Sequence, residues 1–487
     1  MLLDNILNNL RDKNNIKAYT INDKTYMYSD LYKFVCNIYN FLLKKDIQNK
    51  TVIVYGGKDV YMKASFLACS FAGITYIPVD RSIPYERIIE IIKQANPGLI
   101  IGDLKCDSCE VINEKKIYQI MEKDNYIDIE KIYLKENDIY YIIFTSGSTG
   151  TPKGVKVTYK NLDSCIEWLK SITNIENGTV LNQANFSFDL SVADLYLSLL
   201  TKSEHYIIDD EVKGNYNLLF SELKNSKASL AIFTPSFADL LLLDKSFNEE
   251  LMPNLKTIIF CGERLLNSTV EKLYSIFKNL RIINTYGPTE CTFAVTNIEV
   301  PRNQQYNKEI PIGMPKKDVN IYVVDENKKE LEDEKVGEIL ITGKSVAAGY
   351  VGKNENESFI EYNGNKAYLT GDLGYKKDGI LYYKARKDRQ IKYKGYRIEL
   401  SDIENNLNRL EYIDRAIVAT KESDDKKILK IIGFVKLKSD TNKEAIQIKK
   451  DLIKRIPEYM CPTIKIIDKI PINKNGKCDI NKLLEDY

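Results

Sequence analysis

The residues with the clearest chemical meaning form a ten-residue loop, TSGSTGTPKG, at positions 145–154. The loop follows an apolar run at 140–144 that predicts a buried strand. Glycines let successive backbone N–H groups converge on an anion, hydroxyl side chains add donors, and Lys153 adds a mobile charge suited to phosphate. Gly154 and Val155 follow Lys153, so the loop is not the Walker A motif of kinases and GTPases. We predict a phosphate-binding loop, with a flexible surface loop as the alternative.

A second polar segment, NTYGPTE at 284–290, follows another predicted strand. Tyr286 offers a stacking face for adenine, and Asn284 offers a hydrogen bond to the edge of the base. Glu290 offers an oxygen ligand for the Mg²⁺ that accompanies a nucleotide. A plain Gly-Pro turn accounts for the middle of the segment but not for this polar and aromatic cluster.

Three more charged residues each allow two interpretations. Asp372, in YLTGDL, can accept two hydrogen bonds from a ribose diol or serve as a turn residue beside glycine. Asp189, in FSFDLSV, can cap the helix expected at 191–200 or pair with a substrate ammonium. Lys477 follows an Asn-Gly turn and is either a solvated lysine or one that reaches into a cleft.

The elements that must position these residues alternate between strand and helix, a pattern typical of α/β folds. We predict strands at 51–55, 76–79, 140–144, 257–260 and 282–284, and helices at 60–71, 85–94 and 191–200. Period-2 segments at 319–324 and 337–341 predict a smaller β-rich lobe.

Near Asp388 the sequence becomes a dense charged stretch, KARKDRQIKYKGYRIEL, which indicates a solvated face or a hinge. Beyond it we predict a helix at 402–410, strands at 416–420 and 431–437, a helix at 443–455 and a strand at 463–467. The prediction is a large, multi-lobed N-terminal α/β domain (1–387) with a β-rich lobe, and a small, mobile C-terminal α+β domain (388–487).

Composition excludes several classes of protein. The 487 residues carry a net charge of +2, so no basic surface for nucleic acid or anionic membrane is indicated. We find neither a signal peptide nor an apolar run long enough to span a membrane. Nine cysteines, an odd number, favour a reducing cytoplasm, and the single pair Cys106/Cys109 in a CxxC does not predict a zinc site. A single histidine, His205, removes most Ser-His-Asp and Cys-His hydrolase schemes.

In this order, the motifs resemble those of the adenylate-forming superfamily, which includes acyl-CoA synthetases, luciferases and nonribosomal peptide synthetase adenylation domains. Further matching stretches are AGITYIPVD (72–80), VGEILITG (336–343), the charged stretch and NKNGKCD (473–479). Closer features resemble the D-alanine–D-alanyl carrier protein ligase branch. They are YIPVDRSIPYERI (76–88), FSFDLSVADLY (186–196), TPSF (234–237), FCGERL (260–265) and NTYGPTECTFAVT (284–296).

The resemblance implies that an amino-acid carboxylate attacks the ATP α-phosphate and gives an aminoacyl-AMP. Asn284 and Tyr286 would hold adenine, and Asp372 and Arg386 would hold ribose. The implied catalytic residues are Lys477 at the α-phosphate, Glu290 on Mg²⁺, and Thr145. The implied ATP-binding positions are Thr145, Ser146, Gly147, Ser148, Thr149, Gly150, Lys153, Asn284, Tyr286, Gly287, Thr289, Asp372, Arg386 and Lys477.

For the substrate, the resemblance implies that Asp189 pairs with the amino-acid ammonium. A side-chain pocket would be lined by Leu190, Ala193, Cys261, Phe293 and Ala294. Family members usually have Met at the position of Ala193 and Val at that of Phe293, so the pocket is reshaped. D-Alanine, for teichoic acid D-alanylation, is the leading substrate. β-Alanine, glycine or L-alanine in natural-product assembly remain alternatives, as does a non-catalytic nucleotide-binding regulator.

For the second step, the resemblance implies a swing of the C-terminal domain about Asp388. The turn formed by Lys394, Gly395 and Tyr396 would then replace Lys477 and admit a phosphopantetheine thiol. No GG[HD]S carrier signature occurs in the sequence, so we expect a separate carrier protein acting in trans on a monomeric, cytoplasmic enzyme. We expect no nucleic-acid partner and no membrane insertion.

Overall fold

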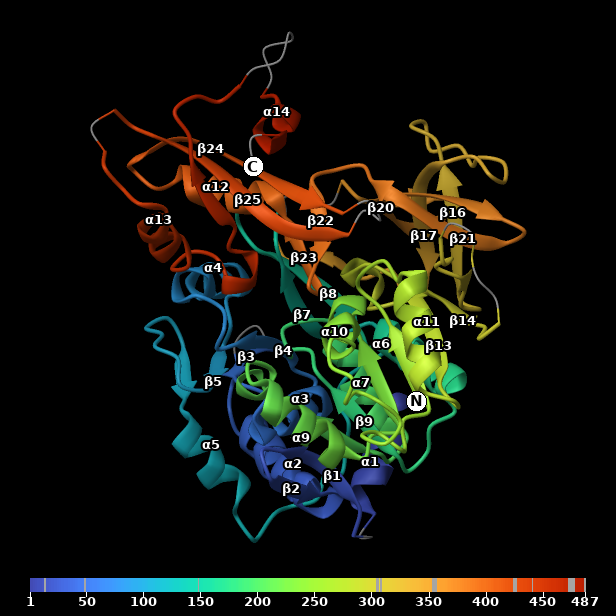
Figure 1. Cartoon of the computed structure of the whole chain (residues 1–487). Helices are drawn as coiled ribbons and strands as arrows, with labels where there is room; N and C mark the ends of the chain where they lie inside the picture. The colour runs from blue at the N-terminus through green and yellow to red at the C-terminus, as the bar shows by residue number, and fades with distance from the viewer. Residues whose placement is uncertain are drawn as a thin grey trace. The chain divides into compact units, whose positions relative to one another are not determined.

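The chain folds into two compact units. The computed structural model describes residues 1–12, 15–47, 50–147, 149–303, 306, 309–352, 357–423, 427–439, 441–471 and 478–485 (Figure 1). The first unit comprises residues 1–80, 95–143 and 154–387, and the second comprises residues 81–94, 144–153 and 388–487. The predicted domain boundary at 388 stays a prediction, since the second unit also includes two segments from the N-terminal part of the chain.

A nine-stranded sheet forms the largest part of the first unit, in the order β15-β14-β13-β12-β11-β9-β10-β1-β2. The strands from β13 to β1 in this order are parallel, and β14, β15 and β2 add antiparallel edges. The bounds are β1 Lys17–Ile21, β2 Lys24–Met27, β9 Thr179–Asn182, β10 Glu204–Ile207, β11 Leu230–Phe233, β12 Thr257–Phe260, β13 Arg281–Tyr286, β14 Thr296–Val300 and β15 Met314–Pro315.

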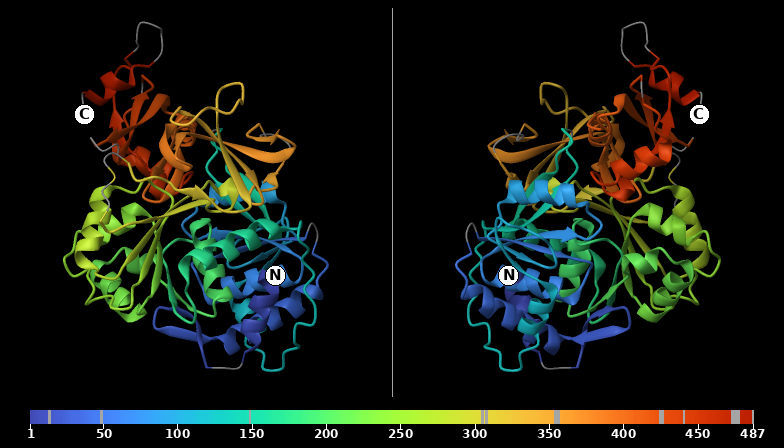
Figure 2. Two further views of the ribbon diagram at one scale, coloured as in Figure 1. Left: turned by 90° about the vertical axis from the view of Figure 1, so that its right-hand side faces the viewer. Right: turned by 90° about the vertical axis from the view of Figure 1, so that its left-hand side faces the viewer.

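The two faces of this sheet contribute side chains to different apolar clusters. Ile258 and Phe260 of β12 pack with helices α9 (Tyr216–Ser226), α10 (Pro235–Leu241) and α11 (Asn267–Ile276). Figure 2 shows these helices, green to yellow-green, along one side of the sheet. Ile259 points the other way, as strand alternation requires, and joins the opposite cluster.

A seven-stranded sheet, in the order β18-β8-β7-β4-β3-β5-β6, completes the large layers. Its strands are β3 Thr51–Gly56, β4 Thr75–Asp80, β5 Leu99–Ile101, β6 Glu110–Ile112, β7 Ile139–Thr145, β8 Lys153–Thr158 and β18 Gly349–Tyr350. The remaining helices of the first unit are α1 Leu2–Arg11, α2 Tyr28–Leu43, α3 Val60–Phe71, α5 Glu114–Met121, α6 Tyr159–Thr173, α7 Leu190–Leu200 and α8 Asp210–Lys213.

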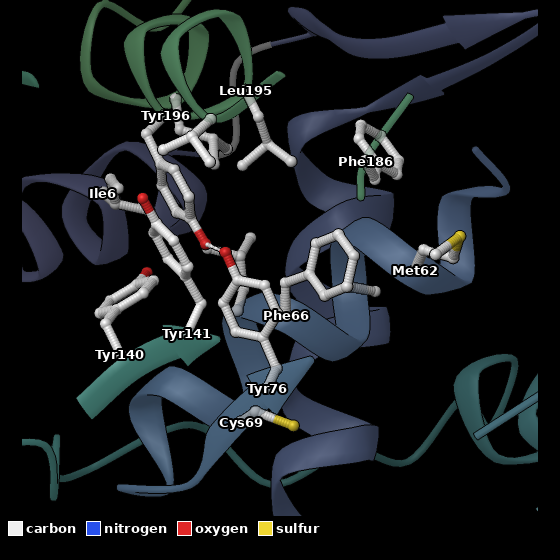
Figure 3. Close-up of a cluster of buried hydrophobic side chains, with 14 of the residues drawn as sticks. Ile6, Met62, Phe66, Cys69, Tyr76, Tyr140, Tyr141, Phe186, Leu195 and Tyr196 are labelled. Atoms are coloured by element: carbon white, nitrogen blue, oxygen red, sulfur yellow. Dashed lines mark hydrogen bonds between the residues drawn. The ribbon is translucent and has the colours of Figure 1, made fainter. Parts of the chain in front are cut away.

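One apolar cluster joins both large sheets with α1, α2, α3, α6 and α7. Its centre is aromatic, as Figure 3 shows: Phe66 stacks on Tyr76 with ring centroids 4.4 Å apart. The Tyr76 and Tyr196 hydroxyls lie 2.8 Å apart and satisfy each other. The cluster therefore carries polar atoms inside an otherwise apolar core, and α7 is fixed against it.

The predicted β-rich lobe is a five-stranded antiparallel sheet in the first unit. Its strands are β16 Val319–Val324, β17 Gly337–Gly343, β19 Phe359–Tyr362, β20 Asn365–Lys377 and β21 Ile380–Arg386. The predicted α/β fold class with a β-rich lobe is confirmed.

The second unit contains a β-hairpin and an α+β segment. The bounds are α4 Tyr85–Ala95, β22 Gln390–Tyr393, β23 Tyr396–Glu399, α12 Leu400–Asn408, β24 Ile413–Glu422, β25 Ile428–Leu437, α13 Ala445–Leu452, β26 Thr463–Ile466 and α14 Ile480–Glu485. Helix α4 joins this unit through Arg87, whose guanidinium lies 3.1 Å from the fully buried Asp402 carboxylate. Within the described residues, no helix is both long and apolar enough to cross a membrane.

Candidate active site

Strand β13 brings the predicted adenine-binding residues to the edge of the β-rich lobe within the first unit. The Tyr286 hydroxyl donates to Asp372 Oδ2 at 2.6 Å. Asp372 lies on β20 opposite Arg386 on β21, and the Arg386 guanidinium donates to Asp372 Oδ1 at 2.9 Å. Burial, followed by the Asp372 carboxylate, raises the pKa of Tyr286 well above its ordinary value, so its hydroxyl stays protonated and donates. The structure therefore brings three of the predicted nucleotide-binding residues together.

The Asp372 carboxylate is 1% exposed and has acceptor positions beyond those that Tyr286 and Arg386 use. An ionised carboxylate offers about four acceptor positions, and Tyr286 and Arg386 fill two of them. Gly371, which precedes Asp372, has φ +71°, and its N–H donates to Glu338 Oε1 at 3.0 Å. Asp372 therefore lies within β20 and not in a turn, and the two donors fix its buried carboxylate in one orientation.

Asn284 lies two residues before Tyr286, on the same face of β13. Its side-chain amide donates to Pro311 O at 2.8 Å, which orients the amide oxygen. Gly287 follows the strand, and a Cβ at this position would lie 2.6 Å from Ala294 Cα. Glycine is therefore required for the close approach of two backbone segments, which the Gly-Pro turn signal did not reveal.

Glu290 lies in a 3₁₀ turn, Thr289–Cys291, and is 1% exposed. The Tyr350 hydroxyl donates to Glu290 Oε1 at 2.6 Å, and Tyr350 lies 3.4 Å from the Tyr368 hydroxyl. Sequence reasoning missed both tyrosines because nothing in their spacing links them to Glu290. Their effect is to hold a buried carboxylate in one orientation.

The predicted amino-acid pocket residues share a single apolar cluster in the first unit, and all are buried: Leu190, Ala193, Cys261, Phe293 and Ala294. Strand alternation explains why Cys261 belongs here, because it follows β12 on the face of Ile259. Leu190 and Ala193 lie one turn apart in the first turns of α7. All five residues thus lie in the large apolar cluster of the first unit, a placement that a purely structural role would also produce.

The turn that carries Phe293 is strained. Thr292 and Phe293 have φ +60° and +70°, a region that β-branched and bulky residues rarely adopt. The Ala294 N–H donates to Thr292 O at 2.9 Å, and Cys261 Sγ lies 3.9 Å from Phe293 O. Such strain persists only where the surroundings hold it, and it often marks a functional site. Sequence reasoning missed it because the segment contains no glycine.

Asp189 occupies the N-cap position of α7, yet its side chain makes no capping hydrogen bond. The alternative of a purely capping aspartate is therefore weakened. Its charge also acts on a nearby buried group. Burial is the largest cause of the raised pKa of Tyr141, the electrostatic effect of Tyr76 is the second, and that of Asp189 is the third. Asp189 is half-buried, at the start of the helix that bears two of the pocket residues.

The phosphate-loop residues belong to the second unit. The Ser146 hydroxyl donates to Arg397 O at 2.9 Å and accepts from the Glu399 N–H at 3.2 Å. The loop turns tightly: the Gly150 N–H donates to Gly147 O at 3.1 Å, and Gly150 has φ +84°. Thr145 ends β7, Lys153 begins β8, and Thr149 is exposed beside Thr151. Ser148 and Lys477 lie outside the described residues.

Residues 390–399 of the charged stretch fold as the β22–β23 hairpin, and most of the side chains in the stretch are exposed or half-buried. Lys394 and Gly395, with φ +53° and +84°, form its two-residue turn, and Tyr393 pairs with Tyr396. The Tyr396 ring stacks on Tyr459 at 3.7 Å. Asp388 accepts from the Gln390 N–H at 3.1 Å just before the hairpin.

Residues 8–351 match the family of AMP-binding enzymes. The chain belongs to the AMP-binding enzyme family. This match confirms the resemblance to the adenylate-forming superfamily that the sequence motifs predicted. A D-alanine–D-alanyl carrier protein ligase of Bacillus licheniformis is 40% identical over 447 residues, which cover 89% of this chain and 89% of the relative.

Another relative of this AMP-binding enzyme has the same name. This D-alanine–D-alanyl carrier protein ligase, from Listeria monocytogenes, is 40% identical over 464 residues, 91% of each chain. Among solved structures, the Vibrio cholerae adenylation domain AlmE, in complex with glycyl-adenosine-5′-phosphate, matches with a TM-score of 0.83. It is 22% identical, and the match covers 100% of this chain and 97% of AlmE, so it supports the fold.

Proposed function

We propose that this AMP-binding enzyme activates D-alanine with ATP as an aminoacyl-AMP and then transfers the aminoacyl group to the phosphopantetheine thiol of a separate carrier protein. The observation that carries the proposal is the joint placement of Tyr286, Asp372 and Arg386 in a family of AMP-binding enzymes. Two relatives at 40% identity over about nine-tenths of the chain, both named for D-alanine, support the substrate. The downstream use that we propose is teichoic acid D-alanylation.

In the first step we assign adenine to the β13 residues Asn284 and Tyr286, together with Gly287 and Thr289. We assign ribose to Asp372 and Arg386. Asp189 would pair with the substrate ammonium and orient its carboxylate toward the α-phosphate, which converts a two-molecule reaction into a positioned one. Lys477 would stabilise the charge that grows as the carboxylate attacks and pyrophosphate leaves.

The remaining ATP contacts are assigned to the phosphate loop, namely Thr145, Ser146, Gly147, Ser148, Thr149, Gly150 and Lys153. The donors present suit Mg²⁺ that is held mainly by its nucleotide. Glu290 supplies one buried carboxylate, and in the described part of the chain no three His, Cys, Asp or Glu side chains group as a metal site. We propose that Glu290 holds the ion, which would neutralise charge on the phosphates when bound.

In the second step we propose that the chain bends at Asp388 and presents the turn of Lys394, Gly395 and Tyr396 to the thiol. The thiolate would then attack the aminoacyl carbonyl and release AMP. The β22–β23 hairpin supports this role because its two-residue turn is preformed. We also propose a monomeric enzyme in the reducing cytoplasm, consistent with nine unbridged cysteines.

ATP–pyrophosphate exchange over D-alanine, L-alanine, glycine and β-alanine tests the proposal. We expect the highest kcat/KM with D-alanine. A clear preference for another of these amino acids would identify that amino acid as the substrate in place of D-alanine, as the unusual Ala193 and Phe293 in the pocket allow. No exchange with any amino acid would instead favour the nucleotide-binding regulator.

Two aspartate variants separate substrate binding from helix capping. Asp189→Asn should cost about 2–5 kcal/mol in kcat/KM for the amino acid, because it strands the ammonium. Asparagine caps as well as aspartate, so a capping role would leave activity and stability unchanged. Asp209→Asn is the matched control, since Asp209 does cap α8 through the Glu211 N–H. If Asp189→Asn and Asp209→Asn changed kcat/KM equally, the assignment of Asp189 to the substrate ammonium would be wrong.

A further inference from the structure

A pair of thiols outside the candidate active site lies in the connection between β5 and β6 of the first unit. Cys106 and Cys109 are both half-buried, and their Sγ atoms are 3.6 Å apart. The Ser108 hydroxyl lies 3.2 Å from Cys106 Sγ. A disulfide needs a sulfur separation of about 2.05 Å, so the two sulfur atoms must approach each other for a bond to form.

The loop that carries the thiols is anchored at both ends. Strands β5 and β6 pair in parallel, and the Gly102 N–H donates to Ile112 O at 2.8 Å. Directly after Cys109, Glu110 forms an ion pair with Lys45 at 2.6 Å. Because the backbone is held on either side, the thiols face each other before any reaction, and little ordering is required to join them.

The two thiols differ in their local electrostatics. Partial burial opposes ionisation of Cys106, but hydrogen bonds from the side chains and backbones of Ser108 and Cys109 together lower its pKa. Burial, and then the neighbouring Cys106, raises the pKa of Cys109 to about 12. Cys106 is therefore the more readily ionised thiol, and Cys109 is the more protonated one.

We propose that Cys106 and Cys109 form a redox-active dithiol that is oxidised to a disulfide by exchange with small disulfides such as oxidised glutathione. This site is separate from the proposed adenylation chemistry and does not depend on it. Two thiols by themselves make a poor metal site, and in the described ranges no third His, Cys, Asp or Glu completes one. Exchange chemistry is therefore the better use of this geometry.

The exchange has two balanced steps. The Cys106 thiolate attacks one sulfur of the small disulfide, a Cys106–glutathione bond forms, and one glutathione thiolate leaves. Cys109 then loses its proton to water and attacks the Cys106 sulfur, which expels the second glutathione thiolate and forms the Cys106–Cys109 bond. The dithiol loses two electrons and two protons, and the small disulfide is reduced to two thiols. Once Cys106 is in the mixed disulfide, its charge no longer opposes ionisation of Cys109.

Mass spectrometry of the reduced, full-length protein tests the site. The protein is treated with oxidised glutathione, quenched with N-ethylmaleimide and digested with trypsin, which places both thiols in the single peptide 106–115. We expect this peptide to carry an internal disulfide, while the half-buried Cys461 and Cys478 are alkylated as thiols. Alkylation of both Cys106 and Cys109 under these conditions would overturn the proposal, as would oxidation of Cys461 or Cys478 at the same rate.

Serine variants test the order of attack. Cys109→Ser should stop as a stable glutathione adduct on Cys106. Cys106→Ser should form an adduct more slowly, on the order of 10-fold or more, because the remaining thiol ionises poorly. Equal adduct rates in the two variants would refute the assignment of Cys106 as the attacking thiol. Urea denaturation followed by the fluorescence of Trp168 serves as the folding control, and we expect both variants to unfold at the urea concentration of the wild type.

Discussion

The hydrogen bond from Tyr286 to Asp372 should make a measurable contribution to the stability of the first unit. Tyr286→Phe removes a hydroxyl that lies 2.6 Å from a carboxylate which is 1% exposed. Hydrogen bonds to charged groups contribute about 1.5–3 kcal/mol, and Arg386 continues to hold the other carboxylate oxygen. We therefore expect the free energy of unfolding to fall by about 2 kcal/mol.

A matched tyrosine and a single fluorophore make this prediction sharp. The buried Tyr141 hydroxyl has no hydrogen-bond partner within the part of the chain that the structure describes, so Tyr141→Phe should leave stability unchanged or raise it. The single tryptophan, Trp168, lies in α6 of the first unit, so its fluorescence during urea denaturation follows that unit. If Tyr286→Phe destabilised the protein no more than Tyr141→Phe, the assignment of a strong buried bond to Asp372 would be wrong.

Three further predictions use other packed groups. Gly287→Ala should lower stability and activity because its Cβ would lie 2.6 Å from facing backbone, whereas Gly214→Ala, with no atom nearer than 3.5 Å, should fold normally in the same urea titration. Burial lowers the pKa of Lys63 to about 7, so the folded state releases a proton that the unfolded state keeps to about pH 10. The stability of the wild type relative to Lys63→Met should therefore rise by up to about 1.4 kcal/mol per pH unit between pH 7 and 10, and a flat difference would contradict this. Arg87→Met should destabilise the second unit by about 3–5 kcal/mol because it leaves the buried Asp402 carboxylate without its cation. Limited proteolysis of that unit should therefore be faster, and an unchanged rate would contradict this prediction.

Local patterns were enough to predict most elements of the fold. The strand predicted at 257–260, the helix at 60–71 and the strand at 319–324 coincide with β12, α3 and β16. These segments are largely apolar, so their own sequence favours a buried strand or helix. The helix predicted at 443–455 is shorter, Ala445–Leu452, because terminal turns depend on contacts that a pattern does not encode.

The charged stretch adopts a structure that its local residue types did not predict. Its charge density indicated a solvated face or hinge, but Lys394 adopts a positive φ beside Gly395 and closes a hairpin. Lysine seldom adopts this conformation, so the turn was predicted by the family resemblance and not by the residue types themselves.

The candidate site was predictable in its motifs but not in its supporting contacts. Asp372 and Tyr286 are 86 positions apart, and their hydrogen bond depends on how the β-rich lobe meets β13. Tyr350 supports Glu290 from 60 positions away for the same reason. Such pairings come from long-range topology, which the spacing of residues along one sequence does not contain.

The alternation along β13 has a consequence for how this protein can evolve. Asn284 and Tyr286 share one face, while Ile283, directly before Asn284, packs into the core on the other face. Deleting or inserting one residue within the strand would exchange its two buried faces, placing Asn284 against the apolar core and moving Ile283 out of it. Lineages can therefore change this strand by substitution, whereas changes of length should accumulate in the connections on either side.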